Sequence, residues 1–287
     1  MKVGLVLEGG AMRGMFTAGV LDIFLDNQIQ VDGIVGVSAG ALFGANFPSK
    51  QRGRALRYNQ KYLNDKRYMG WHSLLSTGNI INKDFAFYQL PFTLDPFDQQ
   101  AFAASGIDFY VTLTNVESGA PEYFKIHNVF EQMELFRATS AMPFVSQMVE
   151  IGSKKYLDGG ISDSIPLEKC RQLGYDKIIV ILTRPLEYRK EPMNKLLPKL
   201  FYRQYPALVK TLIDRHINYN QRIMEIIRAA EQKEIFVIRP SQTLPINRLE
   251  RDPAKIQAMY DLGIEDGKSA VSELQAYLQE YQQSAFF

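Results

Sequence analysis

Residues 33–42 read Gly33-Ile34-Val35-Gly36-Val37-Ser38-Ala39-Gly40-Ala41-Leu42, an apolar strand followed at once by the small-residue start of a helix. A serine with glycine two positions before it and two after it is typical of the nucleophile elbow, a turn too tight for large neighbouring side chains. The dipole of the helix that follows favours negative charge near Ser38. The pattern therefore predicts a nucleophilic serine; a glycine-rich turn without chemistry is the alternative.

A second glycine-rich turn lies near the N-terminus. Val3 to Leu7 is predicted to be a buried parallel strand, and an amphipathic helix follows the loop Gly9-Gly10-Ala11-Met12-Arg13-Gly14. A strand, a glycine loop and a helix in this order build an anion site from backbone N–H groups. The anion is either a nucleotide phosphate or a developing oxyanion, and a tight turn without a ligand is the third possibility. The loop lacks the Lys-Ser/Thr of a P-loop and the spacing of a dinucleotide fingerprint, which disfavours the nucleotide.

Composition narrows the class of protein. The 287 residues are 46% hydrophobic, enough for a large core, and 33 basic residues against 31 acidic ones give no overall field that would attract nucleic acid. One cysteine, Cys170, excludes an internal disulfide framework and a cysteine-rich zinc site. The N-terminal apolar run is too short for a secretory signal, and no uninterrupted apolar stretch approaches membrane-spanning length. We expect a cytoplasmic protein that touches membranes peripherally.

Strands and helices alternate along the chain, which predicts an α/β fold with a parallel sheet. Further strands are predicted at 107–114, 122–126, 177–183 and 235–238, and helices at 129–140, 208–231 and 253–281. Residues 48–67 are polar and basic and are predicted to form a solvated helix face. Residues 71–109 are rich in aromatic side chains and helix breakers and are predicted to form a loop-rich insertion over the core.

Basic side chains are concentrated again between residues 184 and 222. Nine lysines and arginines face only three acids there, and leucine and tyrosine side chains are interleaved with them. Such a mixture fits an anionic lipid surface, with apolar groups inserted and cations near the headgroups. It fits a lid packed on the core equally well.

If Ser38 is a nucleophile, the next question is which residue acts as its general base. The chain has three histidines, His72, His127 and His216, and none of them follows the elbow near a strand end, where a hydrolase triad would place it. A carboxylate acting directly on the serine is the remaining economical choice. Asp158 is predicted to end a strand, and Gly159 and Gly160 after it let another backbone approach closely. An ordinary Asp-Gly turn is the competing interpretation.

The ordered set of motifs resembles the patatin-like phospholipase family. The family's G-G-x-R/K-G loop, G-x-S-x-G elbow and D-G-G motif correspond here to residues 9–14, 36–40 and 158–160, and Ala138 to Phe144 resembles its A-S-x-A-x-P segment. The likeness covers about residues 3–185. It implies a three-layer α/β sandwich with a central, mostly parallel sheet and helices on both faces. It also implies a catalytic core over 1–185 and a C-terminal extension, 186–287, packed on that core.

For the chemistry, the resemblance implies a lipid acyl hydrolase that cleaves phospholipid, lysophospholipid or other lipid esters without metal or cofactor. Ser38 attacks the ester, Asp158 carries the proton, and Gly36, Gly40, Gly159 and Gly160 support the two turns. Backbone N–H groups of Gly10 and Ala11 hold the oxyanion in the loop that Gly9 and Gly14 flank, and Arg13 fixes that loop.

Two departures from the family pattern stand out. First, Ala11 stands where the family usually has a third glycine, and its methyl group is tolerated if φ at this position is negative. Second, an asparagine that the family has near Ser164 is missing. Ala11 and the basic segment keep a second hypothesis open. In it the chain is a non-catalytic lipid-binding or interaction protein that retains the fold.

Overall fold

The computed structural model describes residues 1–284 of the chain, and the side chains of residues 1–279. Eight strands form one sheet in the order β5-β6-β3-β2-β1-β7-β8, with β4 paired to β3. The strands are β1 (Val3–Leu7), β2 (Gly33–Val37), β3 (Asp108–Asn115), β4 (Pro121–Ile126), β5 (Val149–Ile151), β6 (Lys154–Asp158), β7 (Lys177–Ile181) and β8 (Ile235–Ile238). Strands β3, β2, β1, β7 and β8 are parallel, whereas β4 and β6 run antiparallel to β3.

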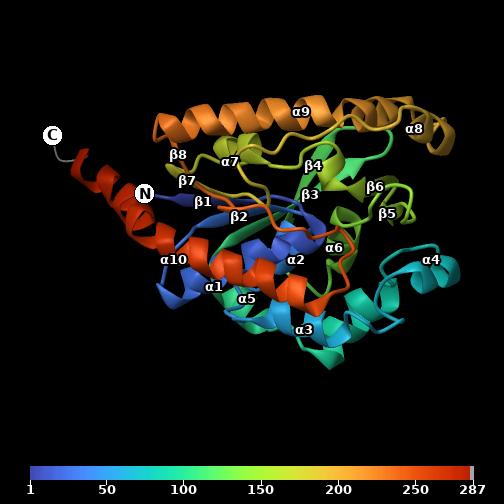
Figure 1. The fold of residues 1–287 in the computed structure, drawn as a ribbon, viewed down its shortest axis with the longest axis horizontal. Coiled ribbons are helices and arrows are strands. Elements are labelled where there is room, and N and C mark those ends of the chain that lie inside the picture. The colour runs from blue at the N-terminus through green and yellow to red at the C-terminus, as the bar shows by residue number, and fades with distance from the viewer. Residues whose placement is uncertain (285–287) are drawn as a thin grey trace.

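Helices cover both faces of the sheet, so the predicted three-layer α/β sandwich is confirmed (Figure 1). One face carries α7 (Leu167–Gln172) and α9 (Pro206–Glu231); the other carries α1 (Met15–Asp26), α2 (Ala39–Gly44) and α10 (Pro253–Ser284). Successive side chains along β1 point to opposite faces of the sheet and so contact both helix layers. Leu5 and Leu7 pack toward α1 and α10, whereas Val6 packs toward α7 and α9. Parallel strands buried on both faces are apolar throughout, as β1 is.

Residues after 185 complete the same sheet and layers. Strand β8 adds a parallel edge to β7, and α10 crosses α1 at close range. A Cβ atom on Gly19 would lie 2.3 Å from the carbonyl oxygen of Tyr260, and one on Gly263 would lie 2.1 Å from that of Phe16. The two helices therefore meet backbone to backbone. Among the described residues, no helix combines the length and the apolar character needed to cross a bilayer.

The aromatic insertion is more regular than the loop-rich segment predicted for residues 71–109. It contains α4 (Trp71–Thr77), the π-helix η2 (Asp84–Leu94) and α5 (Gln99–Ala104). Pro91 lies inside η2, where it has no N–H to donate. The breaker therefore sits within an irregular helix instead of ending one, and such π-helical turns are often found at functional sites. The remaining helices are η1 (Ala11–Gly14), α3 (Arg54–Tyr62), α6 (Met133–Thr139), η3 (Gly159–Ile161) and α8 (Leu196–Phe201).

Strand β3 brings two distant strand ends together. Its residues 108–112 pair with β2, and the last of those pairs joins Thr112 to Val37. The next residue of β3, Leu113, pairs with Asp158 at the end of β6. Because β4 pairs with β3 residues 109–114, it occupies the opposite edge, so β2 and β6 meet end to end along one edge of β3. The residues that leave the two strand ends are therefore neighbours.

Candidate active site

Ser38 occupies the corner between β2 and α2 in a strained backbone conformation. Its φ and ψ angles are 51° and −123°, a region that residues other than glycine rarely adopt. The backbone N–H of Ser38 donates to Thr139 Oγ1 at 2.9 Å, and Thr139 Oγ1 in turn donates to the carbonyl oxygen of Thr112 at 2.7 Å. A Cβ atom on Gly40 would lie 2.6 Å from the carbonyl oxygen of Leu7, so only glycine fits the turn. The surrounding structure thus holds Ser38 in place.

Asp158 faces Ser38 across the junction of β2 and β6. The Ser38 hydroxyl donates to Asp158 Oδ2 at 2.8 Å, and the Gly160 N–H donates to Oδ1 at 2.7 Å. Burial raises the pKa of this carboxyl above its ordinary value, whereas Arg215 and the two hydrogen bonds oppose the rise. A carboxylate that binds a proton more readily is a better base toward a serine hydroxyl.

None of the three histidines makes a hydrogen bond to Ser38 or Asp158 in the part of the chain that the structure describes. His72 and His127 are exposed, and His216 Nδ1 lies 3.0 Å from the carbonyl oxygen of Ile213 in its own helix. The geometry therefore offers Ser38 a carboxylate partner and no imidazole.

The glycine loop after β1 presents backbone donors beside Ser38. Gly10 and Ala11 line the same polar cavity as Ser38, and within residues 1–284 their N–H groups have no acceptor. The Gly9 N–H donates to the Ser164 carbonyl at 3.3 Å, so it is already occupied. Gly14 packs against α2, where a Cβ atom would lie 2.9 Å from that of Ala39. Gly10 and Ala11 are thus the two free donors of the loop.

The φ angle at Ala11 differs from the negative value that its methyl group would prefer. It is +51°, in the left-handed region that glycine tolerates best. The turn out of β1 imposes this conformation. We expect Ala11→Gly to raise the free energy of unfolding by roughly 1 kcal/mol, because glycine relieves the strain. Urea denaturation checks this result; a less stable Ala11→Gly protein would show that Ala11 is unstrained.

The resemblance implies that Arg13 fixes the loop, and no side-chain hydrogen bond of Arg13 does so among the described residues. Its side chain makes no hydrogen bond or ion pair within the described residues, and its Nε atom is buried without a partner. The guanidinium lines the polar cavity beside Ser38. Burial, and next the nearby Arg184, lower the pKa of Arg13 to about 10.

An apolar cavity of about 110 Å³ begins at Ser38 and runs under the aromatic insertion. Its walls come from α2, α3, η2 and α6, and Ser38 and Ala11 also line it. Side chains that line it include Leu42, Phe43, Tyr58, Phe87, Leu90 and Phe136. An apolar cavity of this kind suits an acyl chain.

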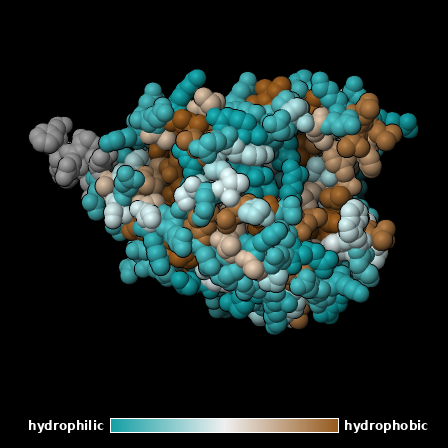
Figure 2. All heavy atoms as spheres, viewed as in Figure 1, coloured by the Kyte–Doolittle hydropathy of each residue, from teal (hydrophilic) through white to brown (hydrophobic). Residues whose placement is uncertain are grey.

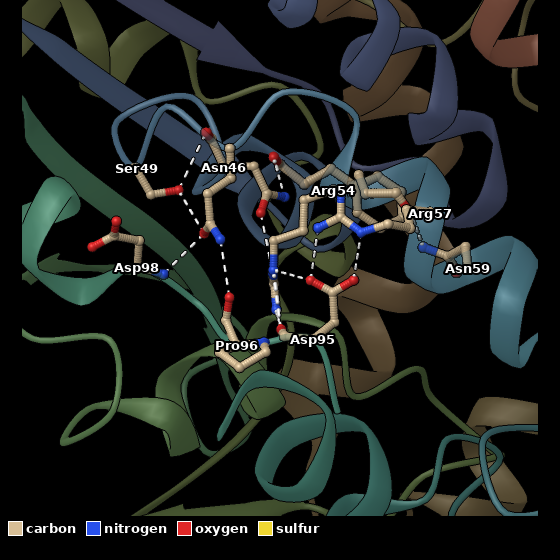
Figure 3. A network of polar contacts seen from close by, with 11 residues as sticks. Asn46, Ser49, Arg54, Arg57, Asn59, Asp95, Pro96 and Asp98 are labelled. Carbon is tan, nitrogen blue, oxygen red and sulfur yellow. Dashed lines mark hydrogen bonds and ion pairs between the residues drawn. The ribbon is translucent and has the colours of Figure 1, made fainter. Parts of the chain in front are cut away.

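A buried polar network anchors the insertion over this cavity (Figure 3). The Arg54 Nε atom lies 3.1 Å from Asp95 Oδ1, and Arg57 donates two hydrogen bonds to the same carboxylate, at 2.8 and 2.9 Å. Arg54 also donates to Asn46 Oδ1 at 3.0 Å. Arg54 is only 5% exposed, so the prediction of a solvated helix face for residues 48–67 is wrong at this position. Its charge holds α3 against the end of η2.

A second cavity, of about 50 Å³, also has Ser38 in its lining and is strongly cationic. Five basic side chains line it together with Glu8 and Asp158: Arg13, Arg184, Lys190, Arg215 and Arg248. Glu8, at the end of β1, accepts hydrogen bonds from the N–H of Thr183 at 2.5 Å and from the hydroxyl of Tyr219 at 2.7 Å. Ser38 thus stands between an apolar cavity and a cationic one.

The sequence analysis missed this cationic cavity, although α9 carries a signal for it. The buried face of α9 includes Leu208, Leu212, Tyr219, Ile223 and Ile226, at helical spacing. Arg215 occupies the same stripe between Leu212 and Tyr219, and a cation in a core-facing position indicates either a buried partner or a site. The basic segment 184–222 also divides: Arg184, Lys190 and Arg215 line the cavity, whereas Lys195, Lys199 and Arg203 are exposed.

Comparison with known proteins identifies the family of this chain. The family model described as patatin-like phospholipase matches residues 5–170. The chain belongs to the patatin-like phospholipase family. A second model, for a domain of unknown function, matches residues 205–279. This patatin-like chain contains no group of three or more His, Cys, Asp or Glu side chains placed to hold a metal ion, among the residues described.

The relatives of this patatin-like chain include uncharacterized and lipid-hydrolysing proteins. Uncharacterized protein YjjU of Escherichia coli is 33% identical over 197 residues, which are 67% of this chain and 54% of YjjU. Lysophospholipase nte1 of Aspergillus fumigatus is 26% identical over 62% of this chain and 12% of its own length. The chain therefore spans about half of YjjU and a small part of nte1. The solved structure of VipD from Legionella pneumophila aligns with a TM-score of 0.42 and 14% identity, over 93% of this chain and 67% of VipD.

Proposed function

We propose that the protein is a serine acyl hydrolase that cleaves ester bonds of phospholipids, lysophospholipids or other lipid esters through a Ser38–Asp158 dyad. The observation that carries the proposal is the 2.8 Å hydrogen bond from Ser38 Oγ to Asp158 Oδ2, located between an apolar cavity and a cationic one. Family membership and the lysophospholipase relatives support a lipid substrate.

In the first half of the reaction, Ser38 Oγ attacks the ester carbonyl carbon and its proton passes to Asp158 Oδ2. The negative charge that develops on the carbonyl oxygen is stabilised by the N–H groups of Gly10 and Ala11. Collapse of the tetrahedral intermediate breaks the bond to the alcohol oxygen, which takes the proton from Asp158. The fatty acyl group then remains on Ser38, with its chain in the apolar cavity.

Water completes the cycle. A water molecule gives a proton to Asp158 and attacks the acyl-enzyme carbonyl, and the oxyanion again forms beside Gly10 and Ala11. Ser38 leaves as the alcohol and takes the proton back from Asp158. The products are a fatty acid and a free alcohol, and the dyad returns to its starting state.

The test of catalysis is covalent labelling. A fluorophosphonate probe reacts with an activated serine, so we expect it to modify Ser38 of the wild-type protein and to leave Ser38→Ala unlabelled, as mass spectrometry of the tryptic peptide would show. A folded wild-type protein that refuses the probe and hydrolyses no p-nitrophenyl ester would favour the non-catalytic lipid-binding alternative.

The pH dependence of the reaction follows from Asp158. The base acts in its ionised form, and burial raises its pKa, so kcat/KM falls as the pH drops through a midpoint above the ordinary aspartate value of 3.8. Arg215 is the strongest of the influences that oppose this rise. We therefore expect Arg215→Gln to move the acid limb of the pH profile to higher pH on a neutral p-nitrophenyl ester. An unmoved limb would mean that another group governs it.

We also propose that the end of the molecule formed by α8 and α4 contacts membranes. Figure 2 shows apolar side chains gathered at this end, where α8 and α4 lie in Figure 1. Leu196 and Leu200, one helical turn apart on α8, are 72% and 74% exposed, and Trp71 and Leu75 on α4 are 73% and 85% exposed. Lys195 and Lys199 stand beside the leucines, which suits an anionic lipid surface. The cytoplasmic location remains a prediction of the sequence.

Vesicle binding checks this surface. We expect the double substitution Leu196→Ser with Leu200→Ser to lower partitioning onto phosphatidylglycerol vesicles by about tenfold, because two inserted side chains are lost. Ile217→Ser is the matched control, since Ile217 is also exposed, at 45%, but lies on α9. Equal losses in both variants would remove the case for a specific membrane-binding end.

A further inference from the structure

The cationic cavity beside Ser38 contains more charge than the dyad uses. Arg13, Arg184, Lys190, Arg215 and Arg248 line it, and the only carboxylates among its lining residues are Glu8 and Asp158. None of the five cations makes a salt bridge or a side-chain hydrogen bond with residues 1–279, whose side chains the structure describes. The Nε atoms of Arg13 and Arg215 are buried and have no partner. Partly buried cations that converge on a cavity without partners favour a bound anion, because an anion offsets the cost of desolvating their charges.

Burial and the neighbouring cations both disfavour the charged form of Lys190. Burial, followed by the charge of Arg215, lowers the pKa of Lys190 to about 6, and Arg248 and Arg13 act in the same direction. The backbone of Lys190 is fixed by Asn220 on α9, whose side chain accepts from its N–H at 2.8 Å and donates to its carbonyl at 3.1 Å. A bound anion would restore the ordinary basicity of Lys190.

The same cavity offers little to a quaternary ammonium group. The two tyrosine faces that could receive one already carry the chain's own cations: the Arg184 guanidinium lies 4.1 Å from the ring centre of Tyr188, and Lys190 Nζ lies 4.2 Å from that of Tyr219. The Glu8 carboxylate is occupied by Thr183 and Tyr219. The electrostatics therefore favour a headgroup with excess negative charge over a zwitterionic one.

We propose that this cavity binds a phosphomonoester on the alcohol side of the scissile ester, so that the enzyme prefers acylglycerol phosphates to choline or uncharged lipids. The inference rests on the proposed hydrolase function and names its substrate class. Ser38, Ala11, Met142 and Arg248 line both cavities, so the two cavities adjoin at Ser38, with the acyl chain in the apolar one and the phosphate in the cationic one. Arginine and lysine are the side chains that recognise a phosphate dianion.

Residues beyond the patatin-like match supply most of this site. Of the five cations, only Arg13 lies within residues 5–170; Arg184, Lys190, Arg215 and Arg248 all follow it. Arg248 is joined to the oxyanion loop, because its carbonyl accepts from the Met12 N–H at 3.3 Å. The C-terminal region thereby acquires a role, which is to select the headgroup for a nucleophile provided by the N-terminal region.

Binding can be measured apart from catalysis. Isothermal titration of full-length Ser38→Ala protein with glycerol 1-phosphate is expected to give a Kd at least tenfold lower than that for glycerophosphocholine. Adding Arg215→Gln or Arg248→Gln should weaken glycerol 1-phosphate binding tenfold or more. Arg248 lies at the exposed mouth of the cavity, so its variant keeps the test valid if Arg215→Gln does not fold. Lys210→Gln is the control, because Lys210 is an exposed cation on α9, the helix that carries Arg215, and is paired with Asp214.

Hydrolysis then distinguishes a headgroup site from a site for free phosphate. We expect wild-type kcat/KM on oleoyl lysophosphatidic acid to exceed that on oleoyl lysophosphatidylcholine by at least tenfold, and this ratio to collapse in Arg248→Gln. Equal rates on the two lipids would overturn the inference, even if inorganic phosphate binds, and would leave the hydrolase proposal intact. If no ester is hydrolysed although glycerol 1-phosphate binds with the expected selectivity, the hydrolase proposal fails while the phosphate site stands.

Discussion

Ser38→Ala is expected to lower kcat on p-nitrophenyl butyrate by a factor on the order of a thousand or more, because the variant cannot form an acyl-enzyme. Such a loss corresponds to about 4 kcal/mol of activation free energy. Asp158→Asn should cause a loss of similar size, since the amide cannot take the proton from Ser38 Oγ. The two losses should not add in the double variant, because both residues serve the same step.

Matched controls separate chemistry from folding. Asp163→Asn replaces another carboxylate that burial makes harder to ionise, five residues after Asp158. The Asp163 carboxylate accepts from the Tyr123 hydroxyl and makes no hydrogen bond to Ser38 among the described residues. Ser269→Ala removes an exposed hydroxyl on α10. Both controls should retain activity, and circular dichroism should be the same for all four proteins. An active Asp158→Asn protein together with an inactive His127→Ala or His216→Ala protein would overturn the dyad.

The largest expected effect on stability belongs to Asp95. Its carboxylate is the counter-ion of Arg54, and the two side chains are 9% and 5% exposed. Asp95→Ala would leave the buried Arg54 guanidinium without a counter-ion, which costs roughly 3 kcal/mol of unfolding free energy. Since the network anchors η2 over the apolar cavity (Figure 3), we also expect weaker discrimination between acyl chains of different length. Chemical denaturation and p-nitrophenyl esters of increasing length measure the two effects.

The control for Asp95 is an arginine–aspartate ion pair at the surface. Arg52 donates two hydrogen bonds to Asp26, at 2.8 and 2.9 Å, but the two side chains are 52% and 41% exposed. Asp26→Ala should cost less than about 1 kcal/mol, because water screens and replaces an exposed pair. Equal losses for Asp95→Ala and Asp26→Ala would show that burial of Arg54 contributes nothing to stability.

Local sequence patterns were sufficient for the elements and for the order of the motifs. Apolar runs predicted β1 and β7, helical spacing predicted α1, α9 and α10, and glycine spacing around Ser38 predicted the strand-to-helix turn. These features depend on neighbours within a few residues along the chain, which is why the sequence alone carries them. The same reasoning failed for η2, because a proline inside an irregular helix is indistinguishable by pattern from a proline that ends a helix.

What only the tertiary structure decided is how distant residues share space. On β3, Thr112 pairs with Val37 and the next residue, Leu113, pairs with Asp158. These adjacent pairs bring a carboxylate to a serine that is 120 residues away in the sequence. The turn between β1 and η1 sets φ at Ala11 to +51°, and the packing of α3 against the end of η2 buries Arg54. Neither residue type nor local spacing encodes these outcomes, because each depends on which backbone lies opposite. The cationic cavity has the same origin: its five charges come from four separate segments, and only the fold makes them one site.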